Sequence, residues 1–168
     1  MRDIWDRIEP WLQANASERF ATLQRGATTQ KIRATERQLG VSFPPDVEES
    51  YRIHDGQTDL GPPLIEEWHL LPLSAVVKEW KLMRKLLTAG KLDGGVVRPV
   101  GPVKAQWWSE KWIPIASNGG GDFRCLDFDP ARGGNVGQVI SFWHMDDKRE
   151  RIAPSFRGWL AAYAKDLK

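Results

Sequence analysis

The stretch WIPIASNGGGDFRCLDF, from Trp112 to Phe128, contains two short apolar runs separated by a glycine-rich turn. Short apolar runs bounded by turn-forming residues are typical of strands, which predicts strands over Trp112–Ser117 and Phe123–Phe128. A third run of this kind follows at Gln138–Trp143. Because short turns can join only antiparallel strands, these runs predict a largely antiparallel sheet.

Helical periodicity lies on both sides of this strand cluster. Apolar residues recur at helical spacing before and after it, and Trp68–Leu71 is short and apolar enough for one further strand. Pro10 removes a backbone donor and predicts a kink or break near Glu9, whereas Gly40 suits the left-handed position that ends a helix. The predicted helices cover residues 4–12, 29–39, 45–56, 75–89 and 156–167.

The order of these elements indicates the fold class. Helices come first, the strands follow, and one helix closes the pattern. This segregation favours an α+β fold in which a largely antiparallel sheet packs against N-terminal helices and a C-terminal helix, with the helices on one face. A length of 168 residues suits one domain over residues 1–168.

The composition excludes several classes of protein. A single cysteine cannot form an intrachain disulfide, and the charged amino terminus does not resemble a secretion signal. No stretch approaches the roughly 18 uninterrupted apolar residues of a membrane span. The formal net charge is only +2, without the basic stripe that binds nucleic acid. We therefore expect a cytoplasmic protein whose partner is neither a membrane nor a nucleic acid.

The densest polar cluster begins at Asn118–Asp122. Its three glycines permit a tight turn or a close approach to a partner, and because they join two strands rather than open a helix, no phosphate loop is expected. Oxygen ligands for Ca²⁺ or Mg²⁺ are available, but the spacing is not that of a calcium loop, so turn formation is the favoured interpretation and no metal or cofactor is expected. The ligand candidates are Asp122, Asp127, Asp129 and Asn135.

Two of the nine tryptophans stand apart from the others. Seven occupy apolar positions of predicted helices and strands, where core packing explains them. Trp107 and Trp108 lie in a polar stretch, and adjacent side chains on an extended chain point to opposite sides, so at least one ring is expected to meet solvent. The alternative is that both rings fold over the sheet edge. Exposed tryptophan is characteristic of binding hot spots and of surfaces that stack on sugars.

No catalytic set is recognisable in the sequence, and an enzyme is not expected. Cys125 is predicted in mid-strand as a small buried hydrophobe, and catalysis would need His144 beside it with a third group to orient that histidine. Glu66 and Glu67 are adjacent, so on a strand they point apart. The candidate partner-binding residues are Trp107, Trp108, Asn118, Gly119, Gly120, Gly121, Asp122, Asp127 and Asp129.

An ordered set of motifs runs from about residue 26 to residue 160. The first half contributes Gly26–Ile32, Thr35–Asp46, Tyr51 and His54–Gly56. The second half contributes Trp112–Ala116, Asn118–Asp122, Leu126–Pro130, Gly133–Gly134, Gly137–Ile140 and Phe156–Leu160. Together they resemble the SUKH superfamily, which includes the Smi/Knr-type regulators of yeast cell-wall assembly and many bacterial immunity proteins.

The resemblance implies a non-catalytic α+β domain that binds a protein. It implies either an immunity protein that neutralises a cognate toxin, with a polymorphic toxin domain as partner, or a cell-wall-related regulator. Inhibitors of basic nucleases are typically acidic, so a chain of charge +2 suits such a toxin only if its aspartates gather on one face. The alternative from the residues is a carbohydrate-binding or carbohydrate-processing domain that uses exposed Trp and Asp side chains.

Overall fold

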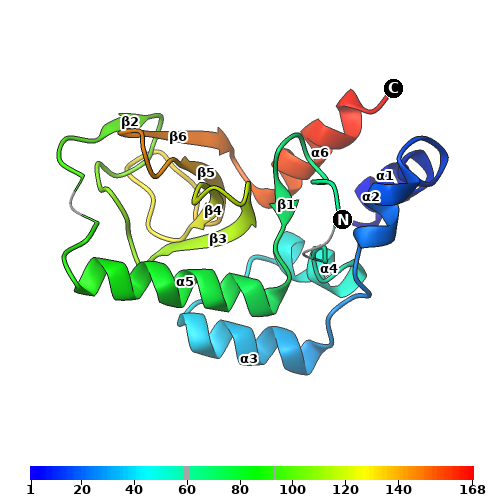
Figure 1. Ribbon diagram of the computed structural model, residues 1–168, viewed down its shortest axis with the longest axis horizontal. Helices are drawn as coiled ribbons and strands as arrows, with labels where there is room; N and C mark the ends of the chain where they lie inside the picture. The colour runs from blue at the N-terminus through cyan, green and yellow to red at the C-terminus, as the bar shows by residue number, and fades with distance from the viewer. Residues whose placement is uncertain (59–60, 93) are drawn as a thin grey trace.

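The computed structural model describes residues 1–58, 61–92 and 94–168 (Figure 1). The helices are α1 (Arg2–Asn15), α2 (Ser17–Thr22), α3 (Thr29–Leu39), α4 (Pro45–Ile53), α5 (Leu73–Thr88) and α6 (Phe156–Asp166). The strands are β1 (His69–Leu70), β2 (Arg98–Val100), β3 (Trp112–Ser117), β4 (Phe123–Asp127), β5 (Gln138–Phe142) and β6 (Lys148–Ala153). None of the helices in these ranges is long and apolar enough to span a bilayer.

Six strands form one sheet in the order β1-β3-β4-β5-β6-β2. All neighbours are antiparallel except β2 and β6, which pair in parallel at one edge. In the centre, Trp112 lies opposite Asp127, and Phe123 lies opposite Phe142. The α+β fold with a largely antiparallel sheet is therefore confirmed.

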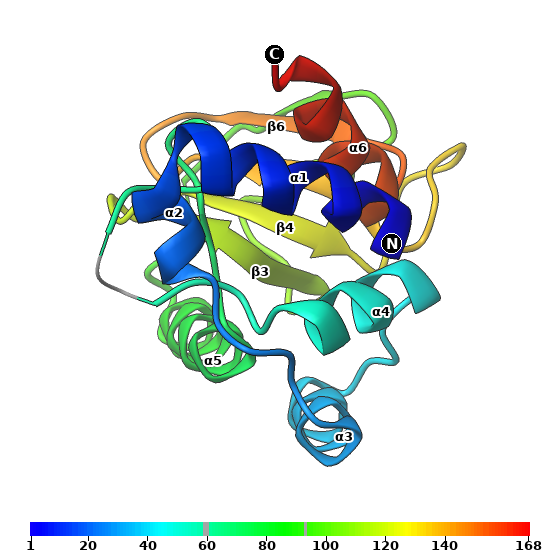
Figure 2. The ribbon, with the colours of Figure 1, turned by 90° about the vertical axis from the view of Figure 1, so that its right-hand side faces the viewer.

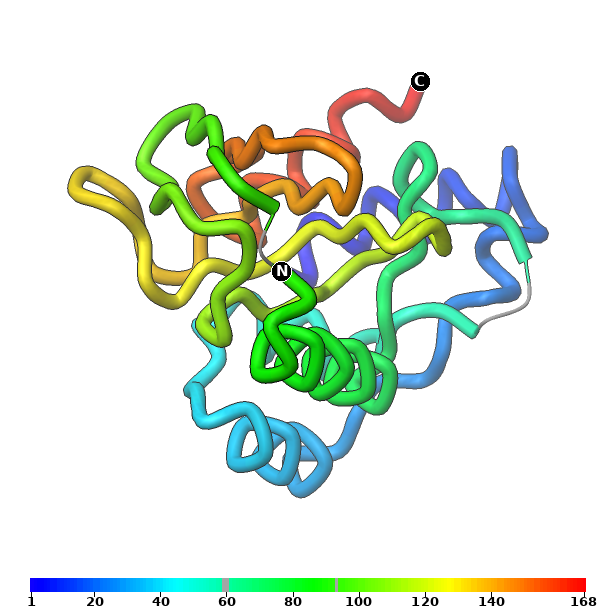
Figure 3. The backbone as a smooth tube through the Cα atoms, turned by 60° about the vertical axis from the view of Figure 1, so that its left-hand side comes forward, coloured from blue at the N-terminus to red at the C-terminus, as the bar shows by residue number. Residues whose placement is uncertain are grey.

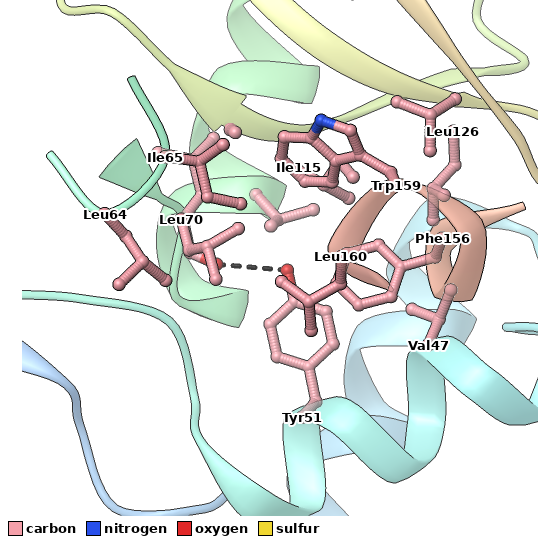
Figure 4. Close-up of a cluster of buried hydrophobic side chains, with 14 of the residues drawn as sticks. Val47, Tyr51, Leu64, Ile65, Leu70, Ile115, Leu126, Phe156, Trp159 and Leu160 are labelled. Atoms are coloured by element: carbon pink, nitrogen blue, oxygen red, sulfur yellow. Dashed lines mark hydrogen bonds between the residues drawn. The ribbon is translucent and has the colours of Figure 1, made fainter. Parts of the chain in front are cut away.

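One face of the sheet packs against α1, α4 and α6 (Figure 2). Ile113, Leu126 and Val139 come from the three central strands and belong to the same buried cluster as apolar residues of these helices. Tyr51 of α4 donates a hydrogen bond to the Leu71 carbonyl at 3.0 Å, as drawn in Figure 4. This bond ties α4 to the chain just before α5.

The opposite face carries a second apolar core, which corrects the expectation of cover on one face alone. Trp112, Cys125 and Ile140 belong to this core, and they alternate along their strands with residues of the first core. Met83 of α5 and Trp108 of the segment after α5 also belong to this cluster. Figure 3 shows this segment looping back from α5 toward the strands.

Helix α1 continues through Pro10, so the helix does not break near Glu9. Ile4, Ile8 and Leu12 are buried in the first core on both sides of the proline. Tertiary packing supplies most of the stability of a helix in a protein, and here it outweighs one missing backbone hydrogen bond.

Three elements were not predicted from the sequence: α2, β2 and β6. Strand β6 reads KRERIA, and a run of four charged residues does not favour a strand. Its backbone nevertheless pairs with β5 on one side and β2 on the other. Sheet pairing therefore overrides local preference in this strand.

Capping residues lie at an end of two of the predicted helices. Helix α3 covers residues 29–39, and Gly40 after it has φ +67°, the left-handed conformation expected of the residue that stops it. At the start of α6, the Ser155 hydroxyl accepts a hydrogen bond from the Gly158 amide at 3.0 Å.

Trp159→Ala should lower the free energy of unfolding by about 3–5 kcal/mol, because it leaves a cavity in the first core. Trp159 is only 6% exposed and packs edge-on against Phe156 with 5.9 Å between ring centroids. Urea denaturation measures the change, with Val136→Ala at a 64% exposed position as the matched control. An equal effect of both substitutions would contradict this account of the core.

Candidate interaction surface

The β3–β4 turn is organised by the side chain of Asn118. Its Oδ1 accepts hydrogen bonds from the amides of Gly120 at 2.8 Å and Asp122 at 3.3 Å, and its Nδ2 donates to Asp122 Oδ2 at 2.8 Å. Gly119 and Gly121 have φ of +77° and +96°, which residues with a side chain rarely adopt. The interpretation of these glycines as turn-forming residues is confirmed.

Asp122 connects this turn to the end of β5. Its Oδ1 accepts hydrogen bonds from the His144 backbone amide and from His144 Nδ1, both at 2.8 Å. Burial acts to raise the pKa of Asp122, but the hydrogen bonds from His144 and Asn118 outweigh it and lower the pKa below its ordinary value. Asp122 is therefore a fixed carboxylate that holds two loops together.

A groove opens beside these loops, between α5, the segment after it and the ends of β4 and β5. We call it the α5 groove, and its volume is about 400 Å³. Trp107, Gly121 and His144 meet along its wall, although they lie far apart in the sequence. Its lining residues are Glu79, Leu82, Met83, Leu86, Lys91, Leu92, Gly94, Trp107, Gly121, Phe123, Phe142 and His144.

The lining of the α5 groove is mostly apolar and includes one large hydrophobic side chain that is exposed. Leu82 of α5 is 48% exposed, although it lies beside the buried Met83 of the second core. Glu79 and Lys91 place one charge of each sign at the groove. An apolar floor with a few polar groups at its margin is the usual composition of a binding site in proteins.

Trp107 and Trp108 have different environments: Trp107 is half-buried, in agreement with the expectation that at least one ring meets solvent, whereas Trp108, also a partner-binding candidate, offers no exposed ring. Trp108 is 4% exposed and packs edge-on against Trp112 and Phe142, with centroid distances of 5.9 and 5.0 Å. Trp107 is half-buried, and the Arg149 guanidinium lies 4.7 Å from its ring centroid. The polar neighbours of Trp108 in the sequence misled the prediction, because its ring turns inward to cover the second core.

The aspartates do not gather on one face. Asp127 is fully buried, where its carboxylate accepts hydrogen bonds from Gln138 Nε2 at 2.9 Å and from the Asp129 amide at 3.0 Å, so its expected place on a binding surface is wrong. Burial raises the pKa of Asp127. Asp129 is half-exposed and pairs with Lys104 Nζ at 2.6 Å.

The structure adds Arg149, a residue that the sequence did not single out. Its side chain is fully buried, and its Nε and Nη2 donate to the Trp107 carbonyl at 3.1 and 3.0 Å. Its Nη1 donates to the carbonyls of Asp146 and Lys148, both at 2.8 Å. Burial lowers the pKa of Arg149 to about 10. Arg149 thereby fixes the backbone that carries Trp107, and nothing in a charged run of sequence signals this role.

Within the described residues, neither a catalytic set around Cys125 nor a metal-binding cluster is assembled. Cys125 is fully buried in the second core, and burial raises the pKa of its thiol well above the usual value. His144 is hydrogen-bonded to Asp122. Within residues 1–58, 61–92 and 94–168, no group of three or more His, Cys, Asp or Glu side chains could hold a metal ion.

Acidification should open the contact between the two loops. A carboxyl group whose pKa is lowered by folding stabilises the folded state above its unfolded pKa of about 3.8, and this contribution is lost as the pH falls through the folded value. We expect the His144 amide resonance to titrate with a midpoint below 3.8 in two-dimensional NMR spectra. Asp122→Asn should abolish the transition, and a midpoint above 3.8 in the wild type would contradict this geometry.

Comparison with known proteins places this architecture in one family. The profile of the SMI1 / KNR4 family (SUKH-1) matches residues 26–162. The chain is 32% identical over 98% of its length to the cell wall biosynthesis/cell cycle regulator smi1 of Schizosaccharomyces pombe. It is 27% and 26% identical, each over 97% of its length, to the glucan synthesis regulatory protein of Neurospora crassa and the cell wall assembly regulator SMI1 of Saccharomyces cerevisiae.

The chain spans 36%, 37% and 39% of the lengths of these three relatives. The matched residues include the β3–β4 turn, Asp122 and the wall of the α5 groove. The resemblance expected over residues 26–160 is confirmed, and the chain belongs to the SMI1 / KNR4 family (SUKH-1).

Proposed function

We propose that this chain is a non-catalytic protein-interaction domain that acts in cell-wall-related regulation. The observation that carries the regulatory role is the family membership, since the three relatives named above are regulators of cell-wall or glucan synthesis. Because the chain matches only about a third of each relative, the role concerns this domain and not the whole of those proteins. Neutralisation of a toxin remains a prediction, for which the names of these relatives offer no support.

The α5 groove is the surface that we propose for the partner. It joins an exposed apolar side chain, Leu82, to an aromatic wall that includes Trp107 and Phe142. Aromatic and apolar side chains in a concave site are characteristic of the residues that contribute most to protein interfaces. The groove is also held in a defined shape, because Arg149 fixes Trp107 and Asp122 fixes His144.

Two of the residues on which the carbohydrate alternative depends are buried. It required exposed tryptophan rings and free carboxylates, whereas Trp108 and Asp127 are buried. Trp107 remains available at the groove. Titration of tryptophan fluorescence with cell-wall oligosaccharides tests this alternative, and we expect no saturable quenching at millimolar sugar.

Leu82→Glu should weaken partner binding by about tenfold or more, which corresponds to about 1.4 kcal/mol, because it places a charge against the apolar wall of the groove. The test uses the full chain as bait in cells of its source, with partners identified by mass spectrometry and affinities then measured with each purified partner. Val136→Glu, also at an exposed apolar position but outside the groove, is the matched control. Equal recovery of every partner by both variants would place the interface elsewhere.

The regulatory role has its own test. Depletion of the protein in its source cells should change their sensitivity to a dye that binds cell-wall polymers, and the wild-type gene should restore it. Complementation by Val136→Glu together with failure of Leu82→Glu would link the groove to the role. Unchanged sensitivity after depletion would refute the regulatory proposal even if a protein partner is found.

A further inference from the structure

A buried arginine lies on the face of the sheet opposite the α5 groove, and two of its donor atoms are unpaired within the described part of the chain. Arg124 of β4 is 8% exposed, and among the described residues its Nε and Nη1 have no hydrogen-bond partner. The indole Nε1 of Trp68, whose ring lies 4.0 Å from the Arg124 guanidinium carbon, also lacks a partner there. These three donor atoms are enclosed and have no acceptor among the described residues, so an acceptor in a neighbouring pocket reaches them only when the side chains around them shift. A buried donor left unpaired destabilises the folded state, and a charged one does so more strongly.

Aromatic stacking stabilises the charge of Arg124 but does not satisfy its donors. The guanidinium carbon lies 4.0 Å from the ring centroid of Trp68 and 5.3 Å from that of Trp143. Stacking engages the faces of the guanidinium plane, whereas its N–H groups point outward within that plane. Burial lowers the pKa of Arg124, although Glu67 and Glu66 act in the opposite direction. An acceptor in the plane of the guanidinium is what the site lacks.

Arg124 lines a pocket of about 310 Å³, which we call the Arg124 pocket. Its walls come from the chain before β1, from β4 and β6, and from α6. Most of the lining is apolar, and the charged members besides Arg124 are the exposed Glu66 and Asp166. The apolar walls include Ile65, Ile152, Trp159 and Leu167.

We propose that the Arg124 pocket binds the carboxylate of a ligand with an apolar body. A planar carboxylate matches the in-plane donors of a guanidinium and forms charge-assisted hydrogen bonds with them. Glu66 and Asp166 repel any anion, and they repel a doubly charged phosphate more strongly than a carboxylate, so the attraction comes from hydrogen bonds to the guanidinium. The apolar walls would cover the body of the ligand. This site is separate from the α5 groove, and the inference does not depend on the proposed function.

The test compares 3-phenylpropionate with its neutral amide and with inorganic phosphate, using the full chain in calorimetry and NMR. We expect the acid to bind about tenfold or more tightly than the amide, phosphate not to bind, and the Trp68 indole and Arg124 Nε–H resonances to shift on addition of the acid. Equal affinity for acid and amide, or no saturable binding of the acid at millimolar concentration, would overturn the proposal. The second result would assign the unpaired donors to internal water alone.

Variants locate the site. Arg124→Met keeps the apolar stem and should weaken binding of the acid by about tenfold or more, while Arg124→Lys should retain part of it, because a lysine keeps the charge without the planar donors. Arg84→Met is the matched control, since Arg84 also stacks on a tryptophan, with 5.4 Å to the Trp80 centroid, but is exposed and outside the pocket. Undiminished binding by Arg124→Met would refute the assignment. Circular dichroism establishes whether each variant is folded. If Arg124→Met does not fold, Arg124→Lys and the comparison of the acid with its amide still test whether the pocket binds a carboxylate.

Two sources of such a carboxylate can be distinguished. A tripeptide ending in phenylalanine, with a free C-terminus or with a C-terminal amide, is titrated beside the free acid. Tighter binding of the free-ended peptide than of 3-phenylpropionate assigns the pocket to a protein C-terminus. Binding of the small acid alone assigns it to a free organic acid. Either result supports carboxylate recognition. If neither the peptide nor the small acid binds, the proposal is overturned.

Discussion

The pairing of β3, β4 and β5 places apolar side chains on both faces of the sheet, and the rest of the fold supplies the cover that both faces need. The first face meets α1, α4 and α6, whose apolar residues join it in one core. Among the described residues, the second face packs against α5 and the segment that follows it. Apolar burial is the largest favourable contribution to folding, so a strand buried on both sides requires both covers at once.

Part of the second cover is irregular backbone, where hydrogen bonds from a side chain to the backbone replace helical packing. A loop over a core must satisfy its own carbonyls, because buried polar groups without partners are costly. Arg149 does this for the carbonyl of Trp107 and for those of Asp146 and Lys148. The α5 groove lies along the junction between this loop and α5. The groove is therefore a consequence of closing one face of the sheet partly with a helix and partly with a loop.

Local signals in the sequence account for much of the fold. Residues 29–39 form the predicted helix and residues 112–117 the predicted strand, because a cap glycine or a turn marks an end of each. The sequence did not reveal β6, whose charged residues are held by pairing on both sides. At the candidate surface, the Asn118–Asp122 turn was predictable from local chemistry. The burial of Trp108 and Asp127 depends on residues distant in the chain, which no local pattern contains.

Adjacent residues of β4 serve opposite sides of the molecule. Phe123 lines the α5 groove, and Arg124 lines the pocket on the other face. Because side chains alternate along a strand, sliding β4 by one residue against its neighbours would exchange the two, driving a guanidinium into the aromatic core and a phenyl ring into the charged pocket. Substitutions within either site can therefore accumulate independently during divergence, whereas a single-residue insertion or deletion within β4 would destroy both together.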